Sequence, residues 1–357
     1  MSYSAMKGNS RLLSEDSADV PIISLLDVTR FEPRKLEKRW LNICDTALGP
    51  VNLPIFAYRG RLPGPTVGIT GAVHGNEVNC IPVIQQFFAR LEQQHDKDQS
   101  TSFAGTIIGV PVLNVPGFLD SVRSFDGQDL NRLMPGNPLG TASQQYANRI
   151  FQEVVVRMDY LFDLHTASAG RQNSLYVRAD MKNPEINRIA GTLGLQIIVH
   201  NSSPGGSLRG CAQRKGIKAV TIEIGNPSTF QQDLIERTID GICSVLTTQL
   251  GYPRLQQNDT KQHQAPIICC RSYWIFSQTA GILQVCKRVG DIVGKGEVVA
   301  EIHSVFGTLL QSFTGPDNYS TVVVGLESNP VAKLGNRIVH LGVIGNEFLD
   351  DAHDGHL

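Results

Sequence analysis

Between residues 53 and 250, short apolar runs rich in β-branched side chains alternate with longer segments whose apolar residues recur every three or four positions. Runs of the first kind predict strands, and segments of the second kind predict helices. This alternation limits the possible folds, because each helix has to carry the chain back across one face of a sheet. We therefore predict an α/β fold with a parallel or mixed sheet and helices on both faces.

The boundaries follow from the same patterns. The predicted strands cover residues 53–59, 66–73, 105–112, 160–165 and 218–225. The predicted helices cover residues 33–43, 78–91, 143–157, 183–193 and 233–250. The first of these helices precedes the alternation and rests on the amphipathic spacing of Leu36, Trp40 and Leu41.

A change of composition after residue 252 predicts a second domain. Residues 253–264 are polar and rich in Gln, and we expect a linker there; residues 265–350 contain short strand patterns separated by Gly turns, which predict a small all-β domain. The first domain would then cover residues 20–252. The 357 residues leave room for two domains of this size. Residues 1–19 and 351–357 are predicted to be tails.

The net charge and the pattern of apolar residues exclude some classes of partner and some cellular locations. With 32 basic and 33 acidic residues the formal net charge is −1, so no single-sign field is available to attract nucleic acid. No apolar run approaches the roughly 18 residues that a membrane helix needs, and the N-terminus has no secretory signal pattern. The seven Cys residues lack the spacing of metal or redox motifs. We expect a soluble, cytoplasmic protein, and a homo-oligomer is compatible with the sequence.

The first chemical motif lies where the predicted strand 66–73 ends. His74 and Glu77 follow it directly. Ligands of open α/β sheets bind at the carboxyl ends of strands, and an imidazole and a carboxylate three residues apart can bind one Zn²⁺. The alternative is an ordinary polar pair in a loop.

Two further strand ends carry polar residues. His165 ends the apolar strand 160–165 and would be a third metal ligand, oriented by Asp163, or else a hydrogen-bonded histidine of the core. Glu223 interrupts the apolar strand 218–225, where a buried carboxylate is costly unless it is paired or protonated. A general base next to a metal site would explain Glu223. The alternative is an edge strand on which this carboxylate faces solvent.

A polar loop between these motifs contains Arg123, Asn131 and Arg132. Arginine offers a planar pair of donors to a carboxylate and asparagine can add another, so Asn131 and Arg132 are candidates for recognition of an acid. Surface arginines are the alternative.

In chain order, these motifs resemble the succinylglutamate desuccinylase/aspartoacylase family, which has a zinc carboxypeptidase-like fold. The family pattern is His-x-x-Glu, an Arg followed by Asp-Leu-Asn-Arg, Asp-x-His, and a late Glu-x-Gly. Its elements here are residues 74–77, Arg123 with 129–132, 163–165 and 223–225. The ordered set is far more specific than any single motif. The resemblance covers residues 53–225 and implies a mixed sheet flanked by helices.

The resemblance implies a role for each matching residue. His74, Glu77 and His165 would bind one Zn²⁺ per chain, Glu223 would be the general base and acid, and Arg123 would polarise the scissile carbonyl group. Zinc with three protein ligands keeps one position open for catalysis, which agrees with these roles.

Substrate contacts are implied at three positions. Asn131 and Arg132 would hold the substrate carboxylate. A further basic contact is expected before the Glu223 strand, where Arg209 is preferred and Arg214 remains an alternative.

The C-terminal segment resembles a different fold. Residues 281–282 and the Val-Gly-Asp-Ile-Val-Gly-Lys-Gly-Glu run at 289–297 resemble the barrel-sandwich hybrid of lipoyl and biotinyl carrier domains. Those domains present a modifiable lysine after a strand, but residues 302–308 contain no lysine, so no prosthetic group is expected. We predict a wall of the active-site mouth or an oligomer contact.

The sequence thus predicts a zinc-dependent amidohydrolase that removes an acetyl-type or succinyl-type N-acyl group from a small, carboxylate-bearing, amino-acid-like substrate. One alternative is a metallocarboxypeptidase that acts on short peptides or peptidoglycan fragments. Another is a metal-binding regulatory protein without catalysis.

Overall fold

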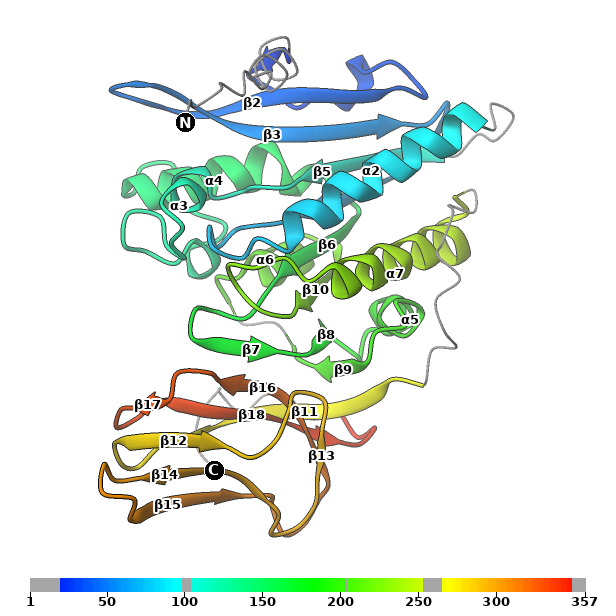
Figure 1. The fold of residues 1–357 in the computed structure, drawn as a ribbon. Coiled ribbons are helices and arrows are strands. Elements are labelled where there is room, and N and C mark those ends of the chain that lie inside the picture. Colours follow the sequence, from blue (N-terminus) through cyan, green and yellow to red (C-terminus); the bar gives the residue numbers. More distant parts are fainter. Residues whose placement is uncertain (1–19, 98–103, 203–204, 253–264, 349–357) are drawn as a thin grey trace, which may run out of the picture.

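A large mixed sheet with helices on both faces forms most of the molecule, and a smaller antiparallel sheet lies at its C-terminal end (Figure 1). The computed structural model describes residues 20–97, 104–202, 205–252 and 265–348. Within these ranges the large sheet has 14 strands and the smaller one has four. This architecture confirms the predicted fold class of a mixed α/β sheet with an additional β region.

The elements have the following bounds. The strands are β1 (Ile22–Ile23), β2 (Leu36–Thr46), β3 (Gly49–Arg59), β4 (Leu62–Thr70), β5 (Ala104–Val110), β6 (Tyr160–His165), β7 (Arg171–Asn173), β8 (Leu175–Ala179), β9 (Ile197–His200), β10 (Lys218–Ile224), β11 (Ile267–Phe276), β12 (Gly281–Val285), β13 (Ile292–Val293), β14 (Val298–His303), β15 (Leu309–Thr314), β16 (Thr321–Glu327), β17 (Val331–Ala332) and β18 (Arg337–Ile344). The α-helices are α2 (Cys80–Lys97), α3 (Val115–Leu119), α4 (Ala142–Glu153), α5 (Pro184–Thr192), α6 (Leu208–Arg214) and α7 (Gln232–Leu250), and single 3₁₀ turns are η1 (Val28–Arg30), η2 (Leu130–Arg132) and η3 (Val155–Arg157).

The centre of the large sheet positions the site. Strands β5, β4, β6 and β10 are neighbours and run parallel, so their carboxyl ends meet at one edge. The register places Glu223 of β10 beside His165 of β6, and Asp163 of β6 beside Thr70 of β4. Strand β8 covers the other side of β10 in antiparallel orientation. Strand β10 is therefore central, and the alternative of an edge strand for Glu223 is wrong.

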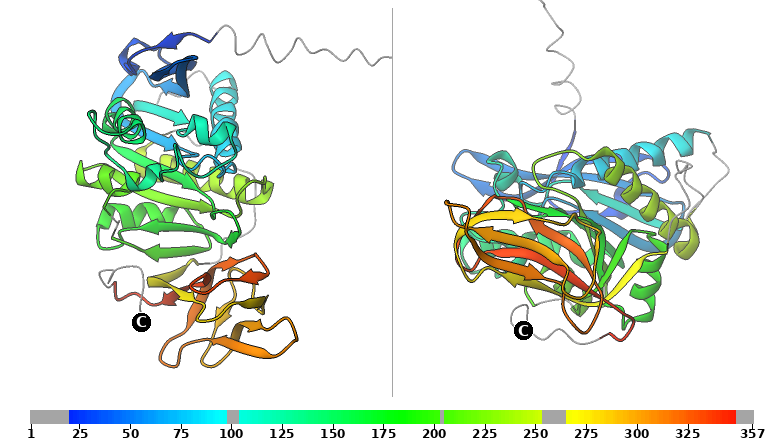
Figure 2. Two further views of the ribbon diagram at one scale, coloured as in Figure 1. Left: turned by 90° about the vertical axis from the view of Figure 1, so that its left-hand side faces the viewer. Right: turned by 60° about the horizontal axis from the view of Figure 1, so that its bottom comes forward.

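Two apolar cores lie on the two faces of this sheet. Helices α2, α5 and α7 cover one face, where Phe87 and Ile239 are fully buried. Helices α4 and α6 cover the other face, where Tyr146 and Leu208 are buried. Figure 2 shows helices on both sides of the sheet. Strand β6 is covered on both faces, with Phe162 in one core and Leu161 in the other, so its apolar residues do not alternate with polar ones.

The predicted helix at 33–43 is wrong. The structure has strand β2 there, paired antiparallel with β3 along its length from Leu36 opposite Tyr58 to Thr46 opposite Gly49. The buried residues Leu41 and Ile43 lie two positions apart, which is the period of a strand. A long partner strand contributes hydrogen bonds and cross-strand contacts that the local spacing does not reveal.

Most other predicted elements agree with the structure to within a few residues, and the strand 160–165 coincides with β6. The sequence patterns missed the short elements β7, β8, β9 and α6, which lie between α4 and β10 and carry several residues of the site. Short elements contain too few residues to establish a period.

The C-terminal region continues the large sheet. Strand β11 pairs in parallel with β9, and β18 and β16 extend the sheet in antiparallel fashion. The sheet β15-β14-β12-β17 packs against these strands around buried residues that include Ile302 and Leu341. The predicted linker 253–264 and the tails 1–19 and 351–357 lie outside the described residues. None of the helices in the described ranges has the length and apolar character that a membrane crossing requires.

Candidate active site

The loop after β4 carries His74 and Glu77 to the carboxyl edge of the sheet. Its tight course depends on Gly75, because a Cβ atom there would lie only 2.0 Å from the backbone carbon of Gly117. The backbone N–H of Glu77 donates to the carbonyl oxygen of His74 at 3.1 Å, which folds the two side chains onto the same side of the loop. A residue larger than glycine at position 75 would push the loop away from α3.

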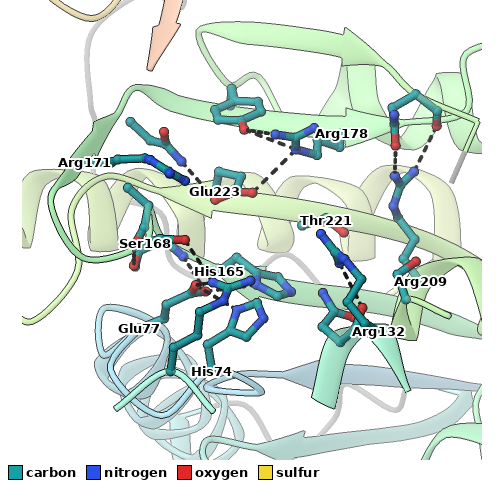
Figure 3. A pocket seen from close by; sticks show the side chains of 18 of the residues that line it. His74, Glu77, Arg132, His165, Ser168, Arg171, Arg178, Arg209, Thr221 and Glu223 are labelled. Atoms are coloured by element: carbon teal, nitrogen blue, oxygen red, sulfur yellow. Dashed lines mark hydrogen bonds and ion pairs between the residues drawn. The ribbon is translucent and has the colours of Figure 1, made fainter. Parts of the chain in front are cut away.

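His74, Glu77 and His165 form one buried cluster (Figure 3). One potential ligand atom from each residue lies within 4.8 Å of the others. The Nδ1 atom of His74 is 2.7 Å from Oε1 of Glu77, and the Nδ1 atom of His165 is 2.9 Å from Oε2 of the same carboxylate. All three side chains are at most 5% exposed. Two imidazoles and one carboxylate are a usual donor set for zinc.

The outer nitrogen of each histidine contacts a second carboxylate. Nε2 of His74 lies 3.0 Å from Oδ1 of Asp129, and Nε2 of His165 lies 2.9 Å from Oδ2 of Asp163. A carboxylate accepts hydrogen bonds, so the Nε2 atom of each ring donates to its aspartate while the Nδ1 atom of each ring faces Glu77. His74 Nδ1 is buried and makes no hydrogen bond. A buried imidazole nitrogen without a hydrogen bond, next to a second imidazole and a carboxylate, is a donor set that fits a divalent metal.

The same contacts act on the pKa of Glu77. Burial by itself would raise this pKa, but the charge of His74 and the hydrogen bond with His165 hold it well below its ordinary value. Glu77 therefore stays ionised, as a metal ligand must be.

Glu223 lies in the same pocket, on β10. Its carboxylate accepts a hydrogen bond from Nδ2 of Asn173 at 3.1 Å, and Oε1 lies 3.5 Å from Nε of Arg178. Burial raises the pKa of Glu223, and the guanidinium of Arg178 partly opposes that rise. A mostly buried carboxylate with a raised pKa, next to a candidate metal site, has the properties of a general base.

Arg123 is fixed between two carboxylates. Its Nη1 atom is 3.0 Å from Oε1 of Glu77 and donates to Oγ of Ser168 at 2.9 Å, while Nη2 is 2.9 Å from Oδ2 of Asp129. These contacts aim the guanidinium at the rim of the His–Glu–His cluster. A fixed cation in this position can stabilise negative charge that develops on a substrate oxygen.

Arg132 and Arg209 lie on the other side of the cluster from Ser168 (Figure 3), and Asn131 lines the same pocket. Oδ1 of Asn131 accepts the backbone N–H of Leu208 at 2.7 Å, which ties the η2 turn to the start of α6 and leaves the amide NH₂ of Asn131 as a donor. Arg209 is buried and contacts Asn201 through both the backbone oxygen and the side-chain Oδ1. Arg214 is exposed and does not line the pocket, so the geometry favours Arg209.

One pocket brings together all eight residues that the sequence singled out for metal, catalysis and substrate. It also contains residues that the sequence patterns missed, namely Ser168, Arg171, Asn173, Tyr176, Arg178, Asn201, Thr221, Trp274 and Arg337. Asp129 contacts both His74 and Arg123. It is the first residue of the Asp-Leu-Asn-Arg motif, so the sequence contained a signal for its role. The sequence contained no such signal for the missed arginines, because an isolated arginine in a strand pattern resembles a surface residue.

The sequence of this chain is similar to those of known proteins. The family model for the succinylglutamate desuccinylase/aspartoacylase catalytic domain matches residues 63–248. An N-alpha-acetyl-L-2,4-diaminobutyric acid deacetylase from Halomonas elongata is 26% identical over 273 residues, which cover 73% of this chain and 77% of that protein.

Two solved structures have a similar fold. A succinylglutamate desuccinylase/aspartoacylase from Rhodobacter sphaeroides superposes with a TM-score of 0.76 at 21% identity, covering 92% of this chain and 100% of the other. The product-bound ectoine utilization protein from Ruegeria pomeroyi gives 0.72 at 19% identity, with 88% and 98% covered. At these identities the likeness concerns the fold. The family match extends over more than half of the chain, and this protein therefore belongs to the succinylglutamate desuccinylase/aspartoacylase family.

Proposed function

We propose that this protein is a zinc-dependent amidohydrolase that removes an N-acyl group from a small amino-acid-like substrate bearing a carboxylate. The observation that carries the proposal is the convergence of His74, Glu77 and His165 with Glu223 in one pocket. The deacetylase from Halomonas elongata, at 26% identity, supports deacylation in preference to peptide cleavage. The cytoplasmic location and a homo-oligomeric state stay predictions of the sequence.

The reaction is the addition of water to an amide carbonyl, followed by loss of the amine. Zinc, when bound by His74, Glu77 and His165, supplies a Lewis acid that lowers the pKa of water toward about 7. Glu223 takes a proton from the attacking water and gives it to the leaving nitrogen as the C–N bond breaks. The products are a carboxylic acid and a free amine.

The arginines of the pocket stabilise and orient the substrate. Arg123, beside Glu77 at 3.0 Å, is close to the position where the carbonyl oxygen would acquire charge. Asn131 and Arg132 would hold the carboxylate of the amino-acid part, with buried Arg209 behind them. A substrate held at this carboxylate presents its amide to the metal site without a large loss of entropy in the transition state.

The test combines metal analysis with an amine-release assay over N-acyl amino acids and dipeptides. We expect about one zinc per wild-type chain, and loss of both metal and amine release in His74→Ala. His303→Ala, which changes a histidine on β14 outside the pocket, is the matched control and should keep both. Folded, zinc-supplemented wild type without metal would contradict the proposal. Preference for dipeptides would indicate a peptidase, and metal without turnover of any substrate would indicate a binding protein.

A further inference from the structure

Among the described residues, the carboxylate of Glu223 has one hydrogen-bond donor. Its Oε2 atom accepts a hydrogen bond from Nδ2 of Asn173 at 3.1 Å. Nε of Arg178 lies 3.5 Å from Oε1, which is beyond the usual length of a hydrogen bond. The terminal torsion of a glutamate side chain is broad, so a single well-placed donor restricts how the two oxygens point.

Asn173 lies where the chain changes its partner strand. Strand β7, which ends at Asn173, pairs with β16 of the C-terminal β region and with no other strand in the described ranges. Strand β8 begins at Leu175 and pairs with β10, the strand of Glu223. Asn173 is therefore held on the side of the β region, while its side chain reaches the proposed general base on the central sheet.

Hydrogen bonds to the β16 region fix β7 at both ends. At one end the backbone N–H of Ser174 donates to the carbonyl oxygen of Val324 at 2.9 Å, and its hydroxyl donates to the same oxygen at 3.1 Å. At the other end the backbone N–H of Ser328 donates to the carbonyl oxygen of Gly170 at 2.8 Å. The position of β16 therefore determines the position of Asn173.

Gly325 of β16 makes room for the amide of Asn173. The two residues are register partners, and a Cβ atom at position 325 would lie 2.6 Å from Oδ1 of Asn173. Any side chain at this position would push the amide away. The pairing of β16 with β18 also shifts between Val323 and Gly325, and such irregularities re-aim side chains next to active sites. Asn173 is only 9% exposed, so its amide has little space to turn elsewhere.

We propose that Asn173 is a positioning residue that holds the carboxylate of Glu223 in the orientation for proton transfer, and that the C-terminal β region sets this amide through Gly325. The inference rests on the proposed function, in which Glu223 is the general base. Asparagine suits the role because its amide donates a hydrogen bond without adding a positive charge that would compete for the proton. The β region thus acts on the base through a residue that contacts it.

The first test separates kcat from KM in Asn173→Ala. We expect kcat for an N-acyl amino acid to fall by about 10- to 100-fold, while KM and zinc content stay within about twofold, because a misplaced base slows proton transfer without weakening binding. Asn187→Ala is the control, since Nδ2 of Asn187 also donates a hydrogen bond, to the carbonyl oxygen of Met181 at 3.0 Å, but outside the pocket. An Asn173→Ala enzyme with wild-type kcat, where Glu223→Gln is inactive, would overturn the positioning role and leave the deacylase function intact.

A double-mutant cycle tests whether Asn173 acts through Glu223. In the Glu223→Gln background, Asn173→Ala should change kcat by less than about twofold, because the carboxylate that it orients is already gone. Losses that multiply in the double variant would mean that Asn173 acts independently of Glu223, and they would overturn the inference.

Gly325→Ala tests the contribution of the β region. The added Cβ atom should displace the Asn173 amide and lower kcat by about tenfold or more, with KM unchanged. Gly342→Ala is the matched control, because a Cβ atom at this β18 glycine would also crowd a side-chain atom, Sγ of Cys269 at 2.5 Å, but outside the pocket. Ser174→Ala, which removes a hydroxyl contact with β16, tests the same link if Gly325→Ala does not fold. Equal kcat values of Gly325→Ala and Gly342→Ala would overturn the role of the β region.

A measurement without turnover separates this inference from the proposed function. Selective ¹⁵N labelling of asparagine gives the side-chain NH₂ signal of Asn173, which is identified by its absence in Asn173→Ala. We expect this signal to shift in Glu223→Gln and in Gly325→Ala but not in Gly342→Ala. If no substrate is hydrolysed while these shifts are seen, the deacylase function fails and the orientation of Glu223 by Asn173 stands. A signal that does not respond to Glu223→Gln would show that the hydrogen bond is absent and would overturn the inference.

Discussion

The carboxyl edge of the parallel strands and the C-terminal β region contribute to the pocket in different ways. The edge supplies the three candidate metal ligands and Glu223, and its charged side chains hold one another in place, as Asp129 does for His74 and Arg123. Among the described residues, the β region supplies Trp274 and Arg337 to the pocket lining. The difference teaches that the groups proposed for bond cleavage lie on one scaffold and that the second region borders the pocket.

This comparison predicts that equivalent substitutions in the two regions have unequal effects on activity. The largest effect is expected for Glu223→Gln, which should lower kcat by about 10²- to 10⁴-fold, because the proton acceptor for water is lost. The zinc content should not change. Glu301→Gln is the matched control, since Glu301 also lies within a strand, β14, but outside the pocket. Steady-state kinetics with metal analysis checks this, and a Glu223→Gln enzyme with more than a tenth of wild-type kcat would refute the assigned role.

The second prediction concerns the carboxylates behind the histidines. Asp163→Asn should weaken zinc binding by about 10- to 100-fold, because Asp163 orients His165 through the 2.9 Å contact with Nε2. Competition with a chelator measures the affinity. Asp291→Asn changes a partly exposed aspartate of the β region, outside the pocket, and should leave the affinity unchanged. Equal affinities of wild type and Asp163→Asn would show that the contact does not orient the ligand.

The third prediction concerns substrate binding at the carboxyl edge of the parallel strands. Arg132→Gln should raise KM for an N-acyl amino acid by about tenfold, with a smaller change in kcat, because a carboxylate contact is lost in both ground and transition states. Arg214→Gln, at the exposed end of α6, should keep KM within about twofold of the wild-type value. If Arg214→Gln had the larger effect, the basic contact would have to be reassigned to that arginine.

The smallest effect on activity is expected from a cavity in the β region. Ile302 is fully buried between the two sheets there, so Ile302→Ala should lower the free energy of unfolding by about 2 to 5 kcal/mol. The kcat of the folded fraction should remain within about twofold of wild type. Denaturant unfolding and kinetics on the same sample measure both, and Phe306→Ala, at a 93% exposed position, is the control for stability. A large loss of kcat would mean that the packing of the whole β region, and not β16 alone, affects catalysis.

Local patterns were sufficient where the structure depends on neighbours in sequence. The strand that ends at His165 and the loop from His74 to Glu77 have compact signatures, and the ordered motifs identified the family pattern. The same reasoning failed at residues 33–43, where pairing with β3 outweighs a spacing that suits a helix.

By itself, the sequence determined most of the alternating elements and the polar residue types at and near the strand ends, because periodicity and turn residues act over a few positions. The pairing of β10 between β6 and β8, which excludes an edge strand, came from the tertiary structure. The tertiary structure alone decided that Arg171 and Arg337 meet over Trp274, and that Arg209 rather than Arg214 faces the pocket. These contacts join residues more than 60 positions apart or depend on which side of a short helix is buried. Such choices follow from packing and pairing across the whole fold, which no local period encodes.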